Sequence, residues 1–289
     1  MQHQHLDIKD CAFYPAFIWV VLLLLVVCPL LWKISSTFRY QVKVFGIYSC
    51  AFLTPFLSFP WILLHPYEPN NHRVVFRIFK RITWWASIDW RVIDFHHLEF
   101  DGPCVIMANH QSSVDLHGMG DVWPDRGVCM IKKSLSYAGL FGIAAHMSQA
   151  VFIDRFNPQD ARTTMVATVK KVKDLKLKLF VFPEGTRNHE DGLLPFKKGG
   201  FHLAVQAQIP IVPVVFSSYK PFYSRKERRW TPNGRALIKV LPPLSTVGLS
   251  TNEDVTQLTE STRLLMLNAF NELSTQAAEL CAESDKKND

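Results

Sequence analysis

The 289-residue chain lacks several features that would place it in common classes of protein. Its six cysteines form no C-x-x-C pair, so the sequence indicates neither a disulfide framework nor a metal site, and we expect reduced thiols. No G-x-S-x-G elbow surrounds Ser112 or Ser113, which disfavours the nucleophilic serine of a hydrolase. No internal repeat divides the chain. Its length suits one ordinary domain plus an appendage.

Charge is missing from long stretches near the N-terminus. Residues 12–32 are uncharged, and a helix of this length covers about 30 Å, the thickness of a bilayer core. This run is too long for a cleaved signal peptide and has no basic start. Residues 44–64 are also uncharged but contain Pro55 and Pro60, so they form a second span or a re-entrant helix. We therefore expect a membrane segment over residues 1–72.

The overall charge favours an anionic partner. The formal net charge is +7 and the isoelectric point is near 9.1. Nucleic acid, phospholipid headgroups and phosphorylated substrates all fit an excess of lysine and arginine. The uncharged N-terminal stretches select the lipid bilayer from this set, so no nucleic-acid partner is expected.

From Val92 onward, short apolar runs alternate with helical patterns, which is typical of an α/β domain with a largely covered sheet. We predict strands at 104–108, 128–131, 150–153, 178–182, 211–216 and 236–240, and helices at 160–175, 199–208 and 254–278. The domain is expected to cover residues 73–282. A polar tail at 283–289 is expected to be disordered.

A histidine and an aspartate follow the apolar run Cys104–Ala108, which suits a buried strand. On one continuous helix, His110 and Asp115 would point about 140° apart. They can meet if His110 lies on the turn after the strand and a helix starts at the capping pattern Ser112-x-x-Asp115. The carboxylate would then fix the tautomer of a histidine that takes up a proton at neutral pH. Taken alone, these residues fit a capped helix and a polar turn equally well.

Two other predicted strands also end in charged residues. The segment Phe182 to Arg187 reads F-P-E-G-T-R, and its glycine, hydroxyl and guanidinium suit the close approach of a phosphate. The segment Val151 to Arg155 delivers an aspartate and an arginine in the same way. Each segment alone also fits a turn with a surface ion pair. Together with His110, they put polar groups at three strand ends, where α/β proteins bind ligands.

The blocks N-H-x-x-x-x-D, F-I-D-R, F-P-E-G-T-R and I-V-P-V-V occur in this order along the chain. In order and spacing they resemble the four blocks of the glycerolipid acyltransferase family, and most of all its branch that acylates lysophosphatidic acid. The resemblance extends from about Arg77 to Leu273. It implies a mixed sheet covered by helices. It also implies a membrane-bound enzyme that moves an acyl group from acyl-CoA to the sn-2 hydroxyl of lysophosphatidic acid, giving phosphatidic acid.

The resemblance further implies a role for each matching residue. His110 looks like the general base that deprotonates the acceptor hydroxyl, and Asp115 looks like the carboxylate that holds it. The residues expected to bind the acceptor are Lys132, Arg155, Glu184, Gly185, Thr186 and Arg187. The expected partners are lysophosphatidic acid, acyl-CoA as co-substrate and the bilayer, with no cofactor.

Other functions stay open on the sequence. A remodelling acyltransferase for another lysophospholipid fits the same blocks. A lipid hydrolase that uses Ser112 or Ser113, and a catalytically silent lipid-binding protein, are rivals from other classes. The chain ends in Lys286-Lys287-Asn288-Asp289, which resembles a dilysine retrieval signal. We therefore expect the endoplasmic reticulum membrane, with the catalytic domain in the cytosol, where acyl-CoA is available.

Overall fold

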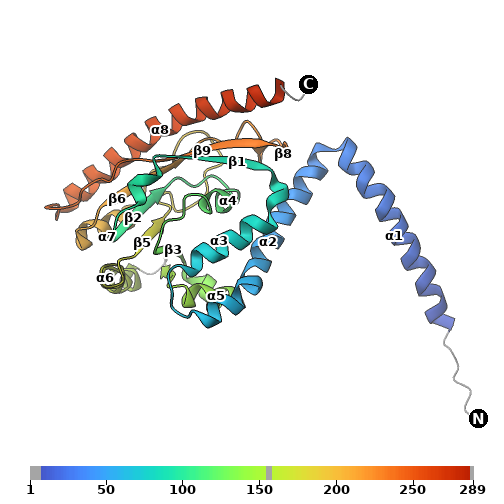
Figure 1. Ribbon diagram of the computed structural model, residues 1–289, viewed down its shortest axis with the longest axis horizontal. Coiled ribbons are helices and arrows are strands. Elements are labelled where there is room, and N and C mark those ends of the chain that lie inside the picture. The colour runs from blue at the N-terminus through green and yellow to red at the C-terminus, as the bar shows by residue number, and fades with distance from the viewer. Residues whose placement is uncertain (1–7, 154–157, 287–289) are drawn as a thin grey trace, which may run out of the picture.

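The computed structural model describes residues 8–153 and 158–286, and Figure 1 shows that they build a sheet with helices on both faces. All neighbouring strands of this sheet are parallel except β6 and β9, which are antiparallel, so the expected mixed sheet is confirmed. In order across the sheet, the strands are β1 (Ile88–Ile93), β9 (Gly234–Val240), β6 (Ile211–Phe216), β2 (Cys104–Ala108), β5 (Lys178–Val181), β3 (Gly127–Lys132) and β4 (Val151–Ile153).

The central strands β2, β5 and β6 are buried along their whole length. Because successive side chains of a strand point to opposite faces, each strand contributes to two core layers. Met107 of β2 belongs to the layer that contains Phe201 and Phe270, whereas Ile106 belongs to the layer that contains Phe76 and Phe79. Continuous apolar runs therefore suit these strands better than an alternating pattern.

Helices cover the two faces of the sheet. Those that pack into the Met107 layer are α6 (Pro158–Asp174), α7 (Gly199–Ala207) and α8 (Asn252–Lys286). Those on the other face are α2 (Ser36–Leu64), α3 (Asn71–Ile82) and α4 (Asp115–Met119), with α5 (Gly139–Met147) packed on α2. Single 3-10 turns, η1 (Trp84–Ala86), η2 (Phe95–Leu98) and η3 (Lys133–Tyr137), lie between these elements.

All six strands predicted for the domain are present, but three further strands were not predicted. β1 carries Asp89 and Arg91 on an edge of the sheet, so it lacks the continuous apolar run of a central strand. β7 (Tyr223–Ser224) and β8 (Arg229–Trp230) form a separate two-stranded ribbon that is too short to leave a pattern. α8 continues to Lys286 and so enters the tail expected to be disordered. Ala277 is buried in the Met107 layer, and the helix continues from there through polar residues.

The N-terminal region forms two helices, α1 (Ile8–Ile34) and α2. Ser35 separates them, and its side chain accepts a hydrogen bond from the N–H of Phe38, which caps α2. Figure 1 shows α2 lying along α3 and α5, while α1 leaves it at a sharp angle and points away from the domain. The boundary predicted after residue 72 falls in the first turn of α3, and α2 packs directly on that helix.

Within the described residues, α2 is the one helix that is long and apolar enough to cross a membrane. It contains the predicted segment 44–64. The predicted span 12–32 lies within α1, where the described apolar part is Leu25–Ile34 and several side chains fall outside the described part of the chain. α2 buries one face, with Ile47 and Ile62, against the domain and exposes apolar side chains on the other.

Candidate active site

The site is built on the loop that joins β2 to α4. Asn109 follows β2 directly, and its side-chain amide donates to the carbonyl of Phe216 at 3.0 Å and accepts from the N–H of the same residue at 2.8 Å. Phe216 is the last residue of β6, so this buried pair ties the ends of two neighbouring strands together. The loop therefore leaves the sheet in a fixed direction.

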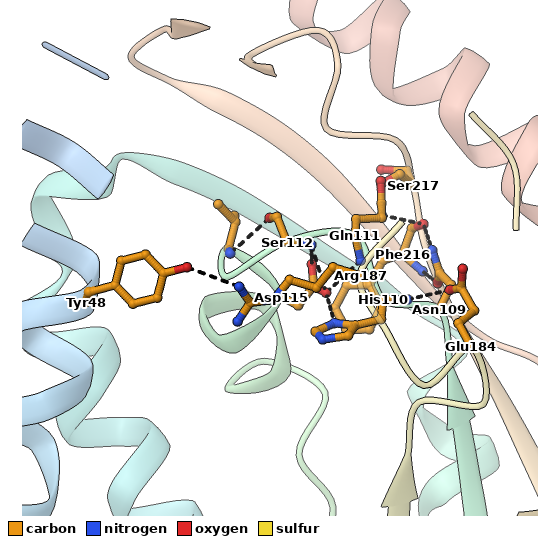
Figure 2. A network of polar contacts seen from close by, with 11 residues as sticks. Tyr48, Asn109, His110, Gln111, Ser112, Asp115, Glu184, Arg187, Phe216 and Ser217 are labelled. Atoms are coloured by element: carbon orange, nitrogen blue, oxygen red, sulfur yellow. Dashed lines mark hydrogen bonds and ion pairs between the residues drawn. The ribbon is translucent and has the colours of Figure 1, made fainter. Parts of the chain in front are cut away.

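His110 and Asp115 are in contact, as the turn geometry predicts. Nδ1 of His110 lies 2.6 Å from Oδ2 of Asp115. The same carboxylate accepts the N–H of Gln111 at 2.8 Å and the N–H of Ser112 at 3.2 Å, and Asp115 is 1% exposed (Figure 2). Three donors thus fix one buried carboxylate, which cannot rotate away from the imidazole without losing them.

This contact determines which nitrogen of His110 can accept a proton. With Nδ1–H donated to Asp115, the lone pair of the neutral ring is on Nε2. The ring stacks on Phe182 with centroids 4.0 Å apart, and 21% of the side chain stays exposed. The arrangement therefore provides an oriented and partly exposed imidazole that can accept a proton on Nε2.

The helix after the loop begins later than predicted. α4 starts at Asp115, and Ser112 lies in the turn before it, where its hydroxyl accepts the N–H of Val114 at 3.0 Å, the kind of hydrogen bond that an N-cap serine makes. Asp115 does reach back to the N–H of Ser112, as a capping acid would. Ser112 is 3% exposed.

Glu184 holds the loop from the neighbouring strand. Its two carboxylate oxygens accept the N–H of His110 at 2.8 Å and the N–H of Leu194 at 2.9 Å. The side chain is buried; burial raises its pKa, and the two backbone hydrogen bonds oppose that shift. Because both oxygens are occupied by the backbone, the geometry favours a positioning role over the direct acceptor contact expected from the sequence.

The residues after Glu184 turn outward. Gly185 has a φ of +70°, a conformation that glycine adopts without strain, and its N–H donates to the carbonyl of Phe182 at 3.1 Å. Thr186 and Arg187 are exposed beyond this turn. Nη1 of Arg187 donates to the hydroxyl of Tyr48 in α2 at 3.1 Å (Figure 2). The turn therefore brings the side chain of Arg187 from the end of β5 into contact with α2.

Of the other two predicted binding residues, only Lys132 lies in the described part of the chain. Lys132 is exposed at the end of β3, which β5 separates from β2. Arg155 follows β4 but lies outside the described residues. In the described part of the chain, no group of three or more histidine, cysteine, aspartate or glutamate side chains could hold a metal ion.

Several contacts of the site have no signal in the sequence. The N–H of Asn188 donates to the carbonyl of His110 at 2.7 Å, and the Gln111 amide donates to the carbonyl of Ser217 at 2.9 Å. Tyr48 comes from the segment predicted for the membrane, so its contact with Arg187 depends on how α2 packs. The N-H-x-x-x-x-D block contains Gln111 but does not reveal its partner.

The central strands of the sheet, the strand-end loops and the His110–Asp115 pair lie in a segment that matches a known protein family. The model of the Acyltransferase family matches residues 89–217. Over most of its length the chain is similar to 1-acyl-sn-glycerol-3-phosphate acyltransferase alpha of Mus musculus, with 41% identity covering 85% of this chain and 86% of the relative. The human protein of the same name is 40% identical, with 89% of this chain and 92% of the relative covered.

The chain therefore belongs to the acyltransferase family that includes these 1-acyl-sn-glycerol-3-phosphate acyltransferases, which confirms the resemblance seen in the sequence. The crystal structure of the 1-acyl-sn-glycerophosphate (LPA) acyltransferase PlsC from Thermotoga maritima is similar in fold, with a TM-score of 0.62. That likeness covers 81% of this chain and 96% of PlsC at 20% identity, so it supports the fold alone.

Proposed function

We propose that the protein transfers an acyl group from acyl-CoA to the sn-2 hydroxyl of lysophosphatidic acid, releasing phosphatidic acid and CoA. The observation that carries the proposal is the 2.6 Å contact between His110 and the buried Asp115 at a strand end. An oriented imidazole of this kind suits the activation of a hydroxyl at neutral pH. The names of the relatives support the acceptor.

In the proposed reaction, Nε2 of His110 takes the proton of the acceptor hydroxyl while the oxygen of that hydroxyl attacks the thioester carbonyl of acyl-CoA. Asp115 stabilises the imidazolium through Nδ1–H. The tetrahedral intermediate collapses with cleavage of the carbon–sulfur bond, and the imidazolium returns the proton to the CoA thiolate. No acyl-enzyme and no cofactor are needed, because the substrate hydroxyl is itself the nucleophile.

The proposed enzyme works at a membrane surface. α2 packs along α3 and α5, so the apolar face with Phe45 and Phe52 is the one available to lipid. A helix held against a domain in this way suits a position in the bilayer interface better than a perpendicular crossing. We place the protein in the endoplasmic reticulum membrane with the catalytic domain in the cytosol. Protection of a C-terminal tag from protease in sealed microsomes would contradict this orientation.

Purified protein and a panel of acceptors test the proposed activity. CoA release is measured with lysophosphatidic acid, lysophosphatidylcholine and glycerol-3-phosphate, each with an acyl-CoA. We expect the highest kcat/KM with lysophosphatidic acid and a loss of about 10²- to 10⁴-fold in His110→Ala. His96→Ala is the matched control, because His96 is exposed on η2.

Preference for another lysophospholipid would instead favour a remodelling acyltransferase. Greater loss on changing Ser112 than on changing His110 would favour a hydrolase mechanism. No CoA release with any acceptor would refute the acyl transfer itself.

A further inference from the structure

A cleft of about 250 Å³ opens beside the catalytic loop and is lined by Gln111 and Ser112 at one end. Its other walls come from the segment after Glu184 and from the β7–β8 ribbon with the loop that precedes it. Four positively charged side chains line it: Lys220, Arg225, Lys226 and Arg229. The reaction proposed above assigns no role to any of them.

These cations differ in what balances their charge. Arg229 donates to a carboxylate oxygen of Glu227 at 2.9 Å, and Lys220 lies 2.5 Å from a carboxylate oxygen of Asp191. Arg225, in contrast, donates from Nη1 to Nε2 of His189 at 2.8 Å. Within the described residues, Arg225 forms no ion pair with a carboxylate. Its positive charge therefore faces the cleft with a neutral hydrogen-bond partner.

His189 connects Arg225 to the catalytic loop. Partial burial, together with the charges of Arg225 and Arg187, lowers the pKa of His189, and its hydrogen bond to the backbone of Gln111 opposes this shift. Because a guanidinium can only donate, Nε2 of His189 accepts from Arg225, and this contact favours the neutral ring. Gln111 directly follows His110, so this chain of contacts fixes Arg225 close to the candidate base.

Arg187 is close to the same histidine, which follows it by two residues in the chain. It comes from the turn after β5, whereas Arg225 comes from the β7–β8 ribbon, and both are close enough to affect His189. Arg187 is held by the hydroxyl of Tyr48, and in the described residues no carboxylate pairs with it. Arg187 and Arg225 thus both lie near His189, and in the described residues neither forms an ion pair with a carboxylate. Two such guanidinium groups suit a dianion, which each can bind through two N–H groups.

We infer that Arg225 is a second phosphate-binding arginine, and that it binds the phosphate monoester of the acceptor together with Arg187. The inference rests on the proposed function. In lysophosphatidic acid, the phosphate is on the carbon next to the one that bears the reacting hydroxyl, so it must bind beside His110. The phosphates of CoA are separated from the thioester by the long pantetheine arm, which places them elsewhere.

Arg225→Gln tests the inference, with Arg228→Gln as the matched control. Arg228 is an exposed cation of the same ribbon turn that does not line the cleft, so both changes remove one charge from the same surface. Steady-state kinetics on vesicles of phosphatidylcholine give KM for lysophosphatidic acid and for acyl-CoA. We expect Arg225→Gln to raise KM for lysophosphatidic acid by about ten-fold or more, with KM for acyl-CoA within about two-fold. Arg228→Gln should change neither by more than about two-fold.

Headgroup selectivity provides a second readout, which a general weakening of the fold would not move. Arg225→Gln should lower the preference for lysophosphatidic acid over lysophosphatidylcholine, because a phosphodiester carries only one negative charge. A rise in KM for acyl-CoA alone would overturn the inference in favour of a CoA site. If Arg225→Gln and Arg228→Gln give the same KM values, the inference is overturned, and Arg225 is then a solvated surface residue of the ribbon turn.

A binding measurement separates this inference from the proposed function. Calorimetric titration of lysophosphatidic acid into the full-length protein in detergent needs no acyl-CoA. In one outcome, wild type binds lysophosphatidic acid, Arg225→Gln binds it about ten-fold more weakly, and neither protein transfers an acyl group. The phosphate site is then supported, and the proposed reaction is refuted. If transfer occurs and Arg225→Gln binds as wild type does, the reaction stands and the site fails.

Discussion

Replacing Glu184 by glutamine tests whether this residue positions the loop that carries His110. The carboxylate accepts two backbone N–H groups, from His110 on one oxygen and from Leu194 on the other. Glutamine has the same shape but only one acceptor oxygen, and its NH2 group must then face one of the two donors. One buried N–H group loses its partner, which costs about 1–3 kcal/mol of unfolding free energy.

The same change should reduce turnover. If the NH2 group faces His110, the loop must move to avoid two opposed donors, and a shift of about 1 Å at a reacting group costs on the order of 10²-fold in rate. We therefore expect Glu184→Gln to lower kcat by about 10- to 100-fold, with KM for lysophosphatidic acid unchanged. Both effects have one cause, so stability and kcat should fall together.

Urea unfolding followed by circular dichroism measures the first effect, and steady-state release of CoA measures the second. Glu260→Gln is the control, because Glu260 is exposed on α8 and the chemical change is identical. A raised KM for lysophosphatidic acid with normal stability and kcat would refute the positioning role. That outcome would return Glu184 to the set of residues that contact the acceptor.

Three further changes have defined outcomes. Asp115→Asn should lower kcat by about 10- to 100-fold. The amide oxygen can still accept the hydrogen bond from His110, but the negative charge that stabilises the imidazolium is lost. Pre-steady-state acyl transfer measures this loss of rate. Burial lowers the pKa of His72 and that of His117 to about 4, from 6.5. The unfolded chain therefore binds more protons than the folded protein between pH 6.5 and 4. The free energy of unfolding should fall as the pH falls through this window, by up to about 1.4 kcal/mol per pH unit for each histidine. Urea titrations at several pH values should show a smaller slope for His117→Asn. Gly185→Ala should lower the unfolding free energy by about 1–2 kcal/mol, because a φ of +70° is strained for alanine, and thermal denaturation measures it.

The elements that could be predicted are those determined by local pattern. β2 and β6 match the predicted strands residue for residue, since short continuous apolar runs between turn residues favour a strand buried on both faces. β1 was missed because an edge strand needs no such run and carries Asp89 and Arg91. The tail after residue 282 is polar, so its local pattern predicts disorder, but α8 continues into it because the preceding turns of the helix are packed on the domain.

The contacts of the site also differ in how far apart their partners lie in the sequence. The contact between His110 and Asp115 spans five positions, so turn geometry could predict it. The contact between His110 and Glu184 spans 74 positions, and that between Tyr48 and Arg187 spans 139. Contacts of this range depend on which strands are neighbours and on where α2 packs, and no local pattern records either. For that reason the sequence predicts the pair of His110 and Asp115 but not the contacts that Glu184 and Tyr48 make with the site.

The contact between Tyr48 and Arg187 links the apolar helix α2 to the site. Tyr48 lies on α2, and neighbouring positions of that helix expose Phe45 and Phe52 to the surroundings. A lysophospholipid has an anionic headgroup and an apolar tail, with the reacting hydroxyl close to the boundary between them. Under the proposed function, the headgroup binds at Arg187 while the tail follows the apolar face of α2 within the bilayer. The hydroxyl then lies at the junction of helix and domain, beside His110, so an acceptor could react without leaving the membrane surface.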